Sequence, residues 1–198
     1  MALTSGRSTP GDSPSQASPS ERVGARLQRL EDRAAIQDLL ARYAHLLDTH
    51  LVDRSLDDQW VDCFTDDAVW DICGGPRAAR YRGREELMRF ITSHDNDPPV
   101  YQHVVSTPAI HLQEDQAWVR SYLVRLEYGN AGPILDAFGS YQDVVVRCRD
   151  GAWRFSHRRV DVWSDPDVGV TGRSARMSAG PTSLNATDPP ADYRGVHR

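Results

Sequence analysis

The chain has 198 residues, with 23 basic and 28 acidic side chains and a formal net charge of −5. That length fits about one domain with room for tails. The acidic balance, without a basic stripe, argues against phosphate-driven nucleic-acid binding, and no apolar run approaches the roughly 20 residues that a membrane-spanning helix needs.

The cysteines and the N-terminal segment indicate the cellular compartment in which the protein is expected. Cys63, Cys73 and Cys148 are an odd number, and they lack the paired spacing of a zinc site or a disulfide framework. Residues 1–7 lack the apolar core of a signal peptide. We therefore expect a cytoplasmic protein that binds neither nucleic acid nor membrane.

The two ends of the chain differ in composition from the middle. Residues 1–24 are rich in Ser, Pro and Gly, which predicts a disordered tail. Residues 165–198 are also rich in Pro, Gly and Ser, and the sequence leaves open whether they are loose or fold over the mouth of a pocket. One domain is expected between them, over residues 25–164.

The domain begins with helical patterns. An apolar stripe at helical spacing predicts a helix over residues 34–48. Asp48 flanks this stripe at the helix end, where the helix dipole disfavours a carboxylate, so its presence there asks for an explanation. Two further helices are predicted over residues 55–64 and 84–91. The members of the stripe are Ile36, Leu40, Tyr43 and Leu47.

Strand-like patterns occupy the rest of the domain. They cover residues 68–73, 100–111, 117–128, 135–148 and 153–163. Helices followed by long antiparallel strands predict an α+β domain with a curved sheet wrapped on its helices. On the strand over 117–128, alternate apolar residues share one face, and these are Trp118, Tyr122, Val124, Leu126 and Tyr128.

With these residues in view, the chain resembles the SnoaL-like branch of the nuclear-transport-factor-2-like superfamily over about residues 27 to 163. The order and spacing of several short pieces carry the resemblance. They are LEDRAAIQDL at 30–39, Arg42-Tyr43 with Asp48 following, FTDDAVW at 64–70, Tyr81-Arg82-Gly83, His103, GSYQD at 139–143 and DGAWRF at 150–155.

The resemblance implies a conical α+β barrel, in which a curved, mostly antiparallel sheet wraps around N-terminal helices and leaves a pocket between them. It also implies a homodimer or a homotrimer. Family enzymes include scytalone dehydratase, a bile-acid dehydratase, a dehydrochlorinase, ketosteroid isomerase and polyketide cyclases. In the dehydratase and dehydrochlorinase members an Asp at the end of the first helix pairs with a His on a later strand. Asp48 and His103 hold those places, and Tyr43 matches a tyrosine of the bile-acid dehydratase.

Such an Asp–His pair supports proton abstraction that needs neither a metal nor another cofactor. Asp48 would hold the imidazole of His103 in one tautomer and raise its basicity, while Tyr43 would hydrogen-bond a substrate oxygen. The plainer alternatives are a solvated carboxylate, a histidine bonded to backbone and a tyrosine packed in the core. The residues expected to contact substrate are Trp70, Trp118, Tyr122, Val124 and Tyr128.

The resulting prediction is a cofactor-independent lyase, a dehydratase acting on a hydroxylated cyclic small molecule of polyketide or terpenoid type. An isomerase or cyclase with the same pair remains open, and so does a ligand-binding module without catalysis. A ketosteroid-isomerase mechanism is disfavoured, because that family places its base on the first strand. Asp71 lies on that strand here, but Trp70 and Ile72 hold the inward parity.

Overall fold

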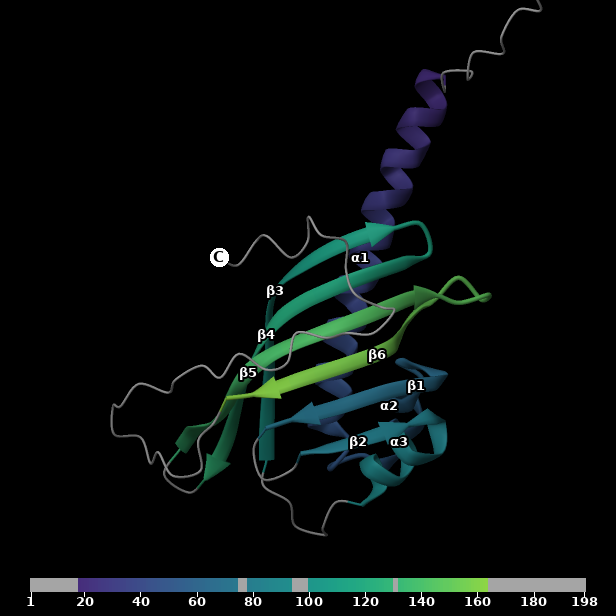
Figure 1. The fold of residues 1–198 in the computed structure, drawn as a ribbon. Helices are drawn as coiled ribbons and strands as arrows, with labels where there is room; N and C mark the ends of the chain where they lie inside the picture. Colours follow the sequence, from purple (N-terminus) through teal and green to yellow (C-terminus); the bar gives the residue numbers. More distant parts are fainter. Residues whose placement is uncertain (1–17, 75–77, 94–99, 130–131, 164–198) are drawn as a thin grey trace, which may run out of the picture.

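The computed structural model of the protein describes residues 18–74, 78–93, 100–129 and 132–163. In this part of the chain, helices cover one face of a single six-stranded sheet (Figure 1). The predicted α+β class with a curved sheet is confirmed, and the sheet is open, with β2 and β3 at its edges. Apart from residues 18–24, the predicted tails lie outside the described residues.

Helix α1 spans Pro19–Thr49 and therefore begins earlier than the composition predicts. The start is fixed by a capping box: the Ser18 side chain accepts from the backbone N–H of Glu21, and the Glu21 carboxylate accepts from the N–H of Ser18. Proline at the first helical position adds a preset backbone angle. Residues 19–24 are thus helical, and assigning them to a disordered tail was wrong.

The sheet has the order β2-β1-β6-β5-β4-β3. Every neighbouring pair is antiparallel except β1 and β6, which run parallel. The strands are β1 Phe64–Cys73, β2 Ala79–Arg82, β3 Val100–Gln113, β4 Gln116–Gly129, β5 Gly132–Arg147 and β6 Trp153–Val162.

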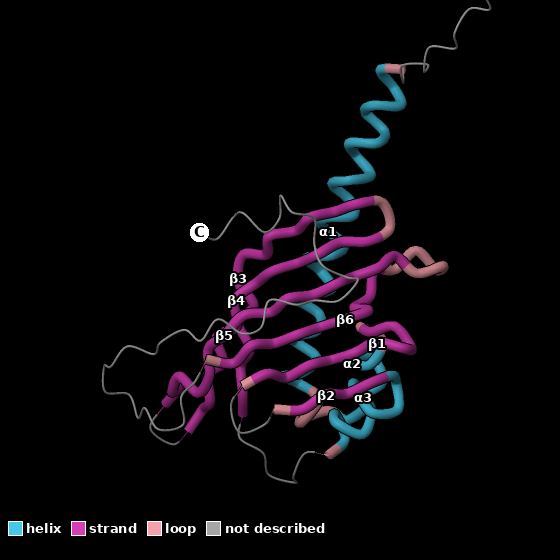
Figure 2. The backbone as a smooth tube through the Cα atoms, in the orientation of Figure 1, coloured by secondary structure: helices cyan, strands magenta, loops and turns pink. Residues whose placement is uncertain are grey.

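The two faces of the sheet have different surroundings. Helix α1 crosses behind the strands, and the opposite face carries no helix of the described chain (Figures 1 and 2). We call these the inner face and the outer face. Lateral partners on neighbouring strands point to the same side of a sheet, so the strand register decides which residues share a face.

Two short helical segments and α3 close one end of the domain. They are η1 Arg54–Leu56, α2 Asp57–Val61 and α3 Gly83–Thr92. The second helix is shorter than predicted because Phe64 already begins β1. Trp60, Trp70 and Phe90 pack there in tilted or edge-to-face geometry, with ring centres 4.6–5.8 Å apart. This aromatic cluster anchors the first strand to the helices.

Gly139 on β5 marks a close backbone approach. A Cβ atom at this position would lie 2.1 Å from the backbone oxygen of Asp161, which cannot yield as a flexible side chain would. We therefore predict that Gly139→Ala lowers the free energy of unfolding by roughly 1–3 kcal/mol, measured by urea denaturation. Gly129→Ala is the matched control, because its Cβ would meet nothing within 4 Å. Equal stability of the two variants would contradict the prediction.

Candidate active site

Asp48 and His103 meet between the C-terminal end of α1 and β3. The Oδ1 atom of Asp48 lies 2.5 Å from Nδ1 of His103. The backbone N–H of His103 also donates to both carboxylate oxygens, at 3.1 and 2.9 Å. The side chains of Asp48 and His103 are 15% and 9% exposed. The structure thus brings together the two residues that the sequence singled out, although they are 55 positions apart.

The edge position of β3 explains the backbone part of this contact. An edge strand has backbone N–H groups that no neighbouring strand accepts, and the carboxylate of Asp48 accepts a hydrogen bond from the backbone N–H of His103. Three hydrogen bonds from one residue also offset the unfavourable place of a carboxylate at the negative end of a helix dipole. The side chain of Asp48 is therefore held on two sides.

This geometry decides which imidazole nitrogen is available. An ionised carboxylate only accepts hydrogen bonds, so the short contact to Asp48 places the proton on Nδ1 of His103. The lone pair then lies on Nε2, which is the arrangement of a general base oriented by an acid.

A fully buried arginine also lies on the inner face. The guanidinium carbon of Arg158 is 3.9 Å from the ring centres of both Tyr43 and Tyr141. Its Nη1 atom is 3.3 Å from Oδ2 of Asp143. Within the described residues, the nitrogens of this guanidinium and the hydroxyl of Tyr43 complete no hydrogen bond of good geometry. Buried donors without acceptors are costly, so this cluster is suited to an oxygen-bearing ligand.

Burial sets the charge of this cluster. It raises the pKa of Asp143 from 3.8 to about 7, against the attraction of Arg158. Burial also raises the pKa of Tyr43 well above its ordinary value, so this phenol keeps its proton at neutral pH. When Asp143 is protonated, the cluster carries the uncompensated positive charge of Arg158. An anionic or polarised oxygen would complement that charge.

The sequence did not single out Arg158. It stands between two other polar residues, His157 and Arg159, so residue type alone does not indicate which of the three side chains points to the inner face. The only signal came from its partner: Asp143 alternates with buried Tyr141 and Val145 along β5. A carboxylate in a row of buried side chains indicates that a buried cation pairs with it.

Arg125 is the cross-strand partner of His103. It forms an ion pair with Asp136, and its guanidinium carbon lies 4.7 Å from the centre of the Tyr101 ring. The lateral neighbour of His103 on β4 is thus a paired cation.

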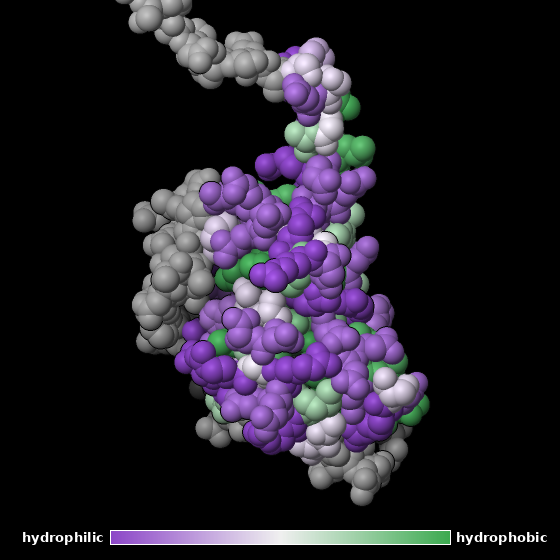
Figure 3. Space-filling model, turned by 90° about the vertical axis from the view of Figure 1, so that its right-hand side faces the viewer, coloured by the Kyte–Doolittle hydropathy of each residue, from purple (hydrophilic) through white to green (hydrophobic). Residues whose placement is uncertain are grey.

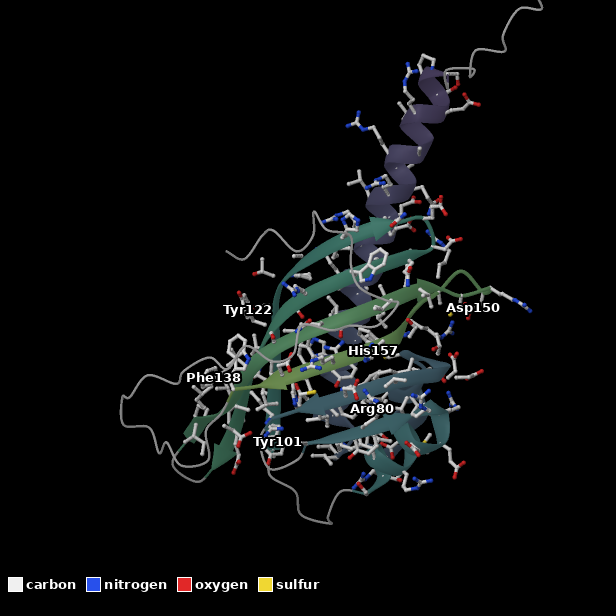
Figure 4. The ribbon with its side chains drawn as sticks, in the orientation of Figure 1. Arg80, Tyr101, Tyr122, Phe138, Asp150 and His157 are labelled. Atoms are coloured by element: carbon white, nitrogen blue, oxygen red, sulfur yellow. The ribbon has the colours of Figure 1, made fainter. Side chains whose placement is uncertain are left out.

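Four of the five residues expected to contact substrate lie on the outer face. Tyr122, Val124 and Tyr128 alternate along β4 with Leu123 and Arg125, which share the face of His103. Tyr122 and Tyr128 are 49% and 46% exposed. Figure 4 shows Tyr122 on the side of the sheet turned away from α1.

Trp118 is the fourth of these residues. It pairs with His111 of β3 and contacts that ring on the outer face. The predicted parity of β4 was therefore wrong by one residue. Both faces of this strand carry apolar side chains, so the alternation of residue types did not separate inside from outside.

Trp70 and Tyr43 lie on the inner side, as the sequence indicated. Trp70 is 3% exposed and packs in the aromatic cluster with Trp60 and Phe90. Tyr43 precedes Asp48 by five residues on α1, a rise of about 7.5 Å along the helix. The Asp48–His103 pair and the Arg158 cluster therefore lie near the same stretch of α1.

Asp71 faces outward, which confirms the parity expected for β1. It forms ion pairs with Arg80, at 2.5 Å, and with Nε2 of His157, at 2.9 Å. Burial acts to raise the pKa of Asp71, but the hydrogen bonds from Arg80 and His157 outweigh it, and the pKa is lowered. By the strand register, this second Asp–His pair lies on the opposite side of the sheet from His103.

Within the described ranges, no group of three or more His, Cys, Asp or Glu side chains is arranged to hold a metal ion. In the same residues, no helix combines the length and the apolar character that a bilayer span requires.

Comparison with known proteins identifies the family. The model of the SnoaL-like domain matches residues 28–159, so the chain belongs to the SnoaL-like family. No curated protein matches the chain at a significant level.

Solved structures show the same fold. A variant of Rv3472, a protein of unknown function from Mycobacterium tuberculosis, is 27% identical with a TM-score of 0.61, covering 77% of this chain and 82% of its own. An NTF2-like protein with a cystatin-like fold from Novosphingobium aromaticivorans is 21% identical with a TM-score of 0.62, over 71% and 87% of the two chains. A protein of the same organism, provisionally assigned as a scytalone dehydratase, is 20% identical with a TM-score of 0.57, over 76% and 97%.

The raised pKa of Asp143 predicts a pH dependence of stability. An acid whose pKa is higher in the folded than in the unfolded state binds more protons when folded, so stability falls as the pH rises between the two values. We expect this contribution to decline from about pH 4 to about pH 7, and Asp143→Asn to remove the decline. Urea denaturation at several pH values measures it, with exposed Asp66→Asn as the control. An unchanged pH slope in Asp143→Asn would contradict the assignment.

Proposed function

We propose that this protein is a cofactor-independent lyase of the dehydratase type, in which His103 is the general base and Asp48 orients it. The observation that carries the proposal is the 2.5 Å contact between Asp48 and Nδ1 of His103, which leaves Nε2 free to take a proton. The SnoaL-like family and the fold shared with a provisionally assigned scytalone dehydratase support this class of chemistry.

The proposed elimination needs one base and one group that stabilises oxygen. Nε2 of His103 removes a proton from a carbon next to a carbonyl, and the electron pair of the C–H bond forms the new double bond. The neighbouring C–O bond breaks, and the departing hydroxide takes a proton from the imidazolium and leaves as water. General acid–base assistance of this kind accounts for about 10²–10⁴ in rate.

The buried cluster supplies the second requirement. Arg158 and the hydroxyl of Tyr43 are fully buried donors that complete no hydrogen bond of good geometry within the described chain, although Arg158 forms an ion pair with Asp143. A substrate oxygen that gains negative charge during proton removal would satisfy them. Donors fixed in a dry site typically lower such a barrier by about 2.7–4 kcal/mol.

The proposed substrate is a hydroxylated cyclic small molecule of polyketide or terpenoid type. Apolar and aromatic side chains dominate the buried interior of the domain, while its polar groups are few and include the Asp48–His103 pair, Arg158 with Asp143, and the His50–Asp57 pair. A mostly apolar ring system with a carbonyl and a hydroxyl group matches that distribution.

An isomerase or cyclase would use the same proton abstraction, and product mass separates the classes. Loss of one water from the substrate identifies a lyase, whereas an unchanged mass identifies isomerisation or ring closure. A ligand-binding module without catalysis would return the bound molecule chemically unchanged.

Proton abstraction can be measured before the natural substrate is known. Cyclic β-hydroxyketones incubated with the protein in D₂O should exchange the proton next to the carbonyl and lose water, both detected by mass spectrometry. We predict that His103→Ala and Asp48→Asn lower both rates by about 10²–10⁴ without loss of the fold. His157→Ala is the matched control, because it removes the histidine of the Asp71 pair on the outer face. Near-normal exchange in His103→Ala would remove the Asp48–His103 pair from the mechanism.

Tyr43→Phe tests the role of the phenol separately from packing. The hydroxyl has no hydrogen-bond partner in the described chain, so its removal should leave the thermal unfolding midpoint equal or slightly higher. We predict that kcat falls by about 10²–10³, because one donor to the developing oxyanion is lost. An unchanged kcat would reduce Tyr43 to a core residue.

A further inference from the structure

The N-terminal part of α1 projects beyond the body of the protein. The helix continues past β3, away from the sheet (Figure 1). Every residue from 19 to 31 is exposed. A helical segment of this length is only marginally stable in water without a packing partner. The capping box at Ser18 fixes where it starts but does not supply such a partner.

This projecting segment carries an apolar stripe. Val23, Leu27 and Leu30 are 64%, 55% and 65% exposed, which makes them some of the most exposed large hydrophobic residues of the described chain. Their spacing of four and three residues continues through Ala34, which is exposed as well. This is the pattern of the a and d positions of a two-helix seam. Figure 3 shows hydrophobic side chains at the surface of this part of the helix.

The stripe is not an extension of the core. The residues of α1 that are buried against the sheet repeat with the same spacing at Asp32, Ile36, Leu39 and Tyr43. The two rows are offset by two residues, which is about 200° around a helix. The N-terminal half of α1 therefore has two faces on opposite sides, and the described residues pack only against the one that continues into the core.

Charges flank the stripe asymmetrically. With Leu27 at an a position and Leu30 at a d position, Arg26 occupies a g position and Glu31 the following e position. In a parallel pair of helices, a g residue of one chain faces the next e residue of the other. A second copy of this helix would therefore place each Arg26 beside a Glu31 of the partner. This complementarity favours a second copy over an unrelated partner.

We propose that the projecting half of α1 is a dimerisation element, in which Val23, Leu27, Leu30 and Ala34 pack against the same residues of a second copy in parallel orientation. The arrangement is free of obstruction from the sheet, since the sheet contacts the opposite side of the helix. The two domains would then lie on the outer sides of the paired helices. This proposal does not depend on the proposed catalytic function.

The first experiment measures the mass of the full-length protein by sedimentation equilibrium over a range of concentrations. We expect a dimer, and we expect Leu27→Glu to weaken dimerisation by more than about 100-fold, because it places two charges in the seam. Ala25→Glu adds the same side chain to an exposed position on the far side of the helix and should leave the dimer intact. Thermal unfolding of the monomeric variant should show that its domain remains folded.

The second experiment tests the orientation. Arg26→Glu alone and Glu31→Arg alone each place like charges together twice in a parallel homodimer, so both should dissociate more readily. An equimolar mixture of the two variants restores both opposite-charge pairs, and it should form heterodimers several-fold more strongly than either variant pairs with itself.

Three results would overturn the proposal. A monomeric wild-type protein would mean that the stripe has no second copy as its partner. An unchanged mass for Leu27→Glu would mean that subunits associate elsewhere, for example through the outer face of the sheet. Absence of heterodimer in the mixture would exclude the parallel arrangement.

Discussion

The candidate site depends on one contact, the carboxylate of Asp48 against His103. A strand at the edge of a sheet leaves N–H groups without acceptors, and a helix end leaves a carboxylate in an unfavourable field. The contact satisfies groups on both elements, because the carboxylate of Asp48 accepts hydrogen bonds from the backbone N–H and the ring N–H of His103. The same contact fixes where α1 ends relative to β3. Structural support and the orientation of the imidazole therefore have a single physical cause.

The buried charged groups on the inner face lower the stability of the fold. A guanidinium and a carboxylate are buried at Arg158 and Asp143, and the rings of Tyr43 and Tyr141 pack against the cation. Burying such a pair rarely stabilises a fold more than apolar side chains of similar size would. A cluster with unsatisfied donors is therefore better explained by a ligand than by folding. The outer face, by contrast, pairs its charges near solvent, as Asp71 does with Arg80 and His157.

Helix α1 links these features to the surface. One side of it holds the core and packs Tyr43 against the sheet, and Asp48 at its C-terminal end reaches β3. In the projecting half, the side opposite the core carries an apolar stripe that the described chain leaves exposed. A helix with two apolar faces needs two partners. The sheet is one of them, and a second copy of α1 is the partner that the flanking charges favour. Assembly and active-site geometry would then share one rigid element.

The class of fold, the main helix and the strands could be predicted from the amino-acid sequence, because helical and strand periodicity are local properties. The pairing of Asp48 with His103 came from the resemblance to the SnoaL-like branch. The capping box at Ser18 is present in the sequence, but the Ser- and Pro-rich composition around it led to the prediction of a disordered tail. Which face of each strand is turned to the inside follows from the packing of the strands in three dimensions. Tyr122 and Leu123 are both apolar, so their chemistry does not distinguish the two sides, and the register with β3 and β5 does. It likewise took the sheet to join Asp143 to Arg158, since lateral contacts between strands depend on register and bulges that a single sequence does not specify.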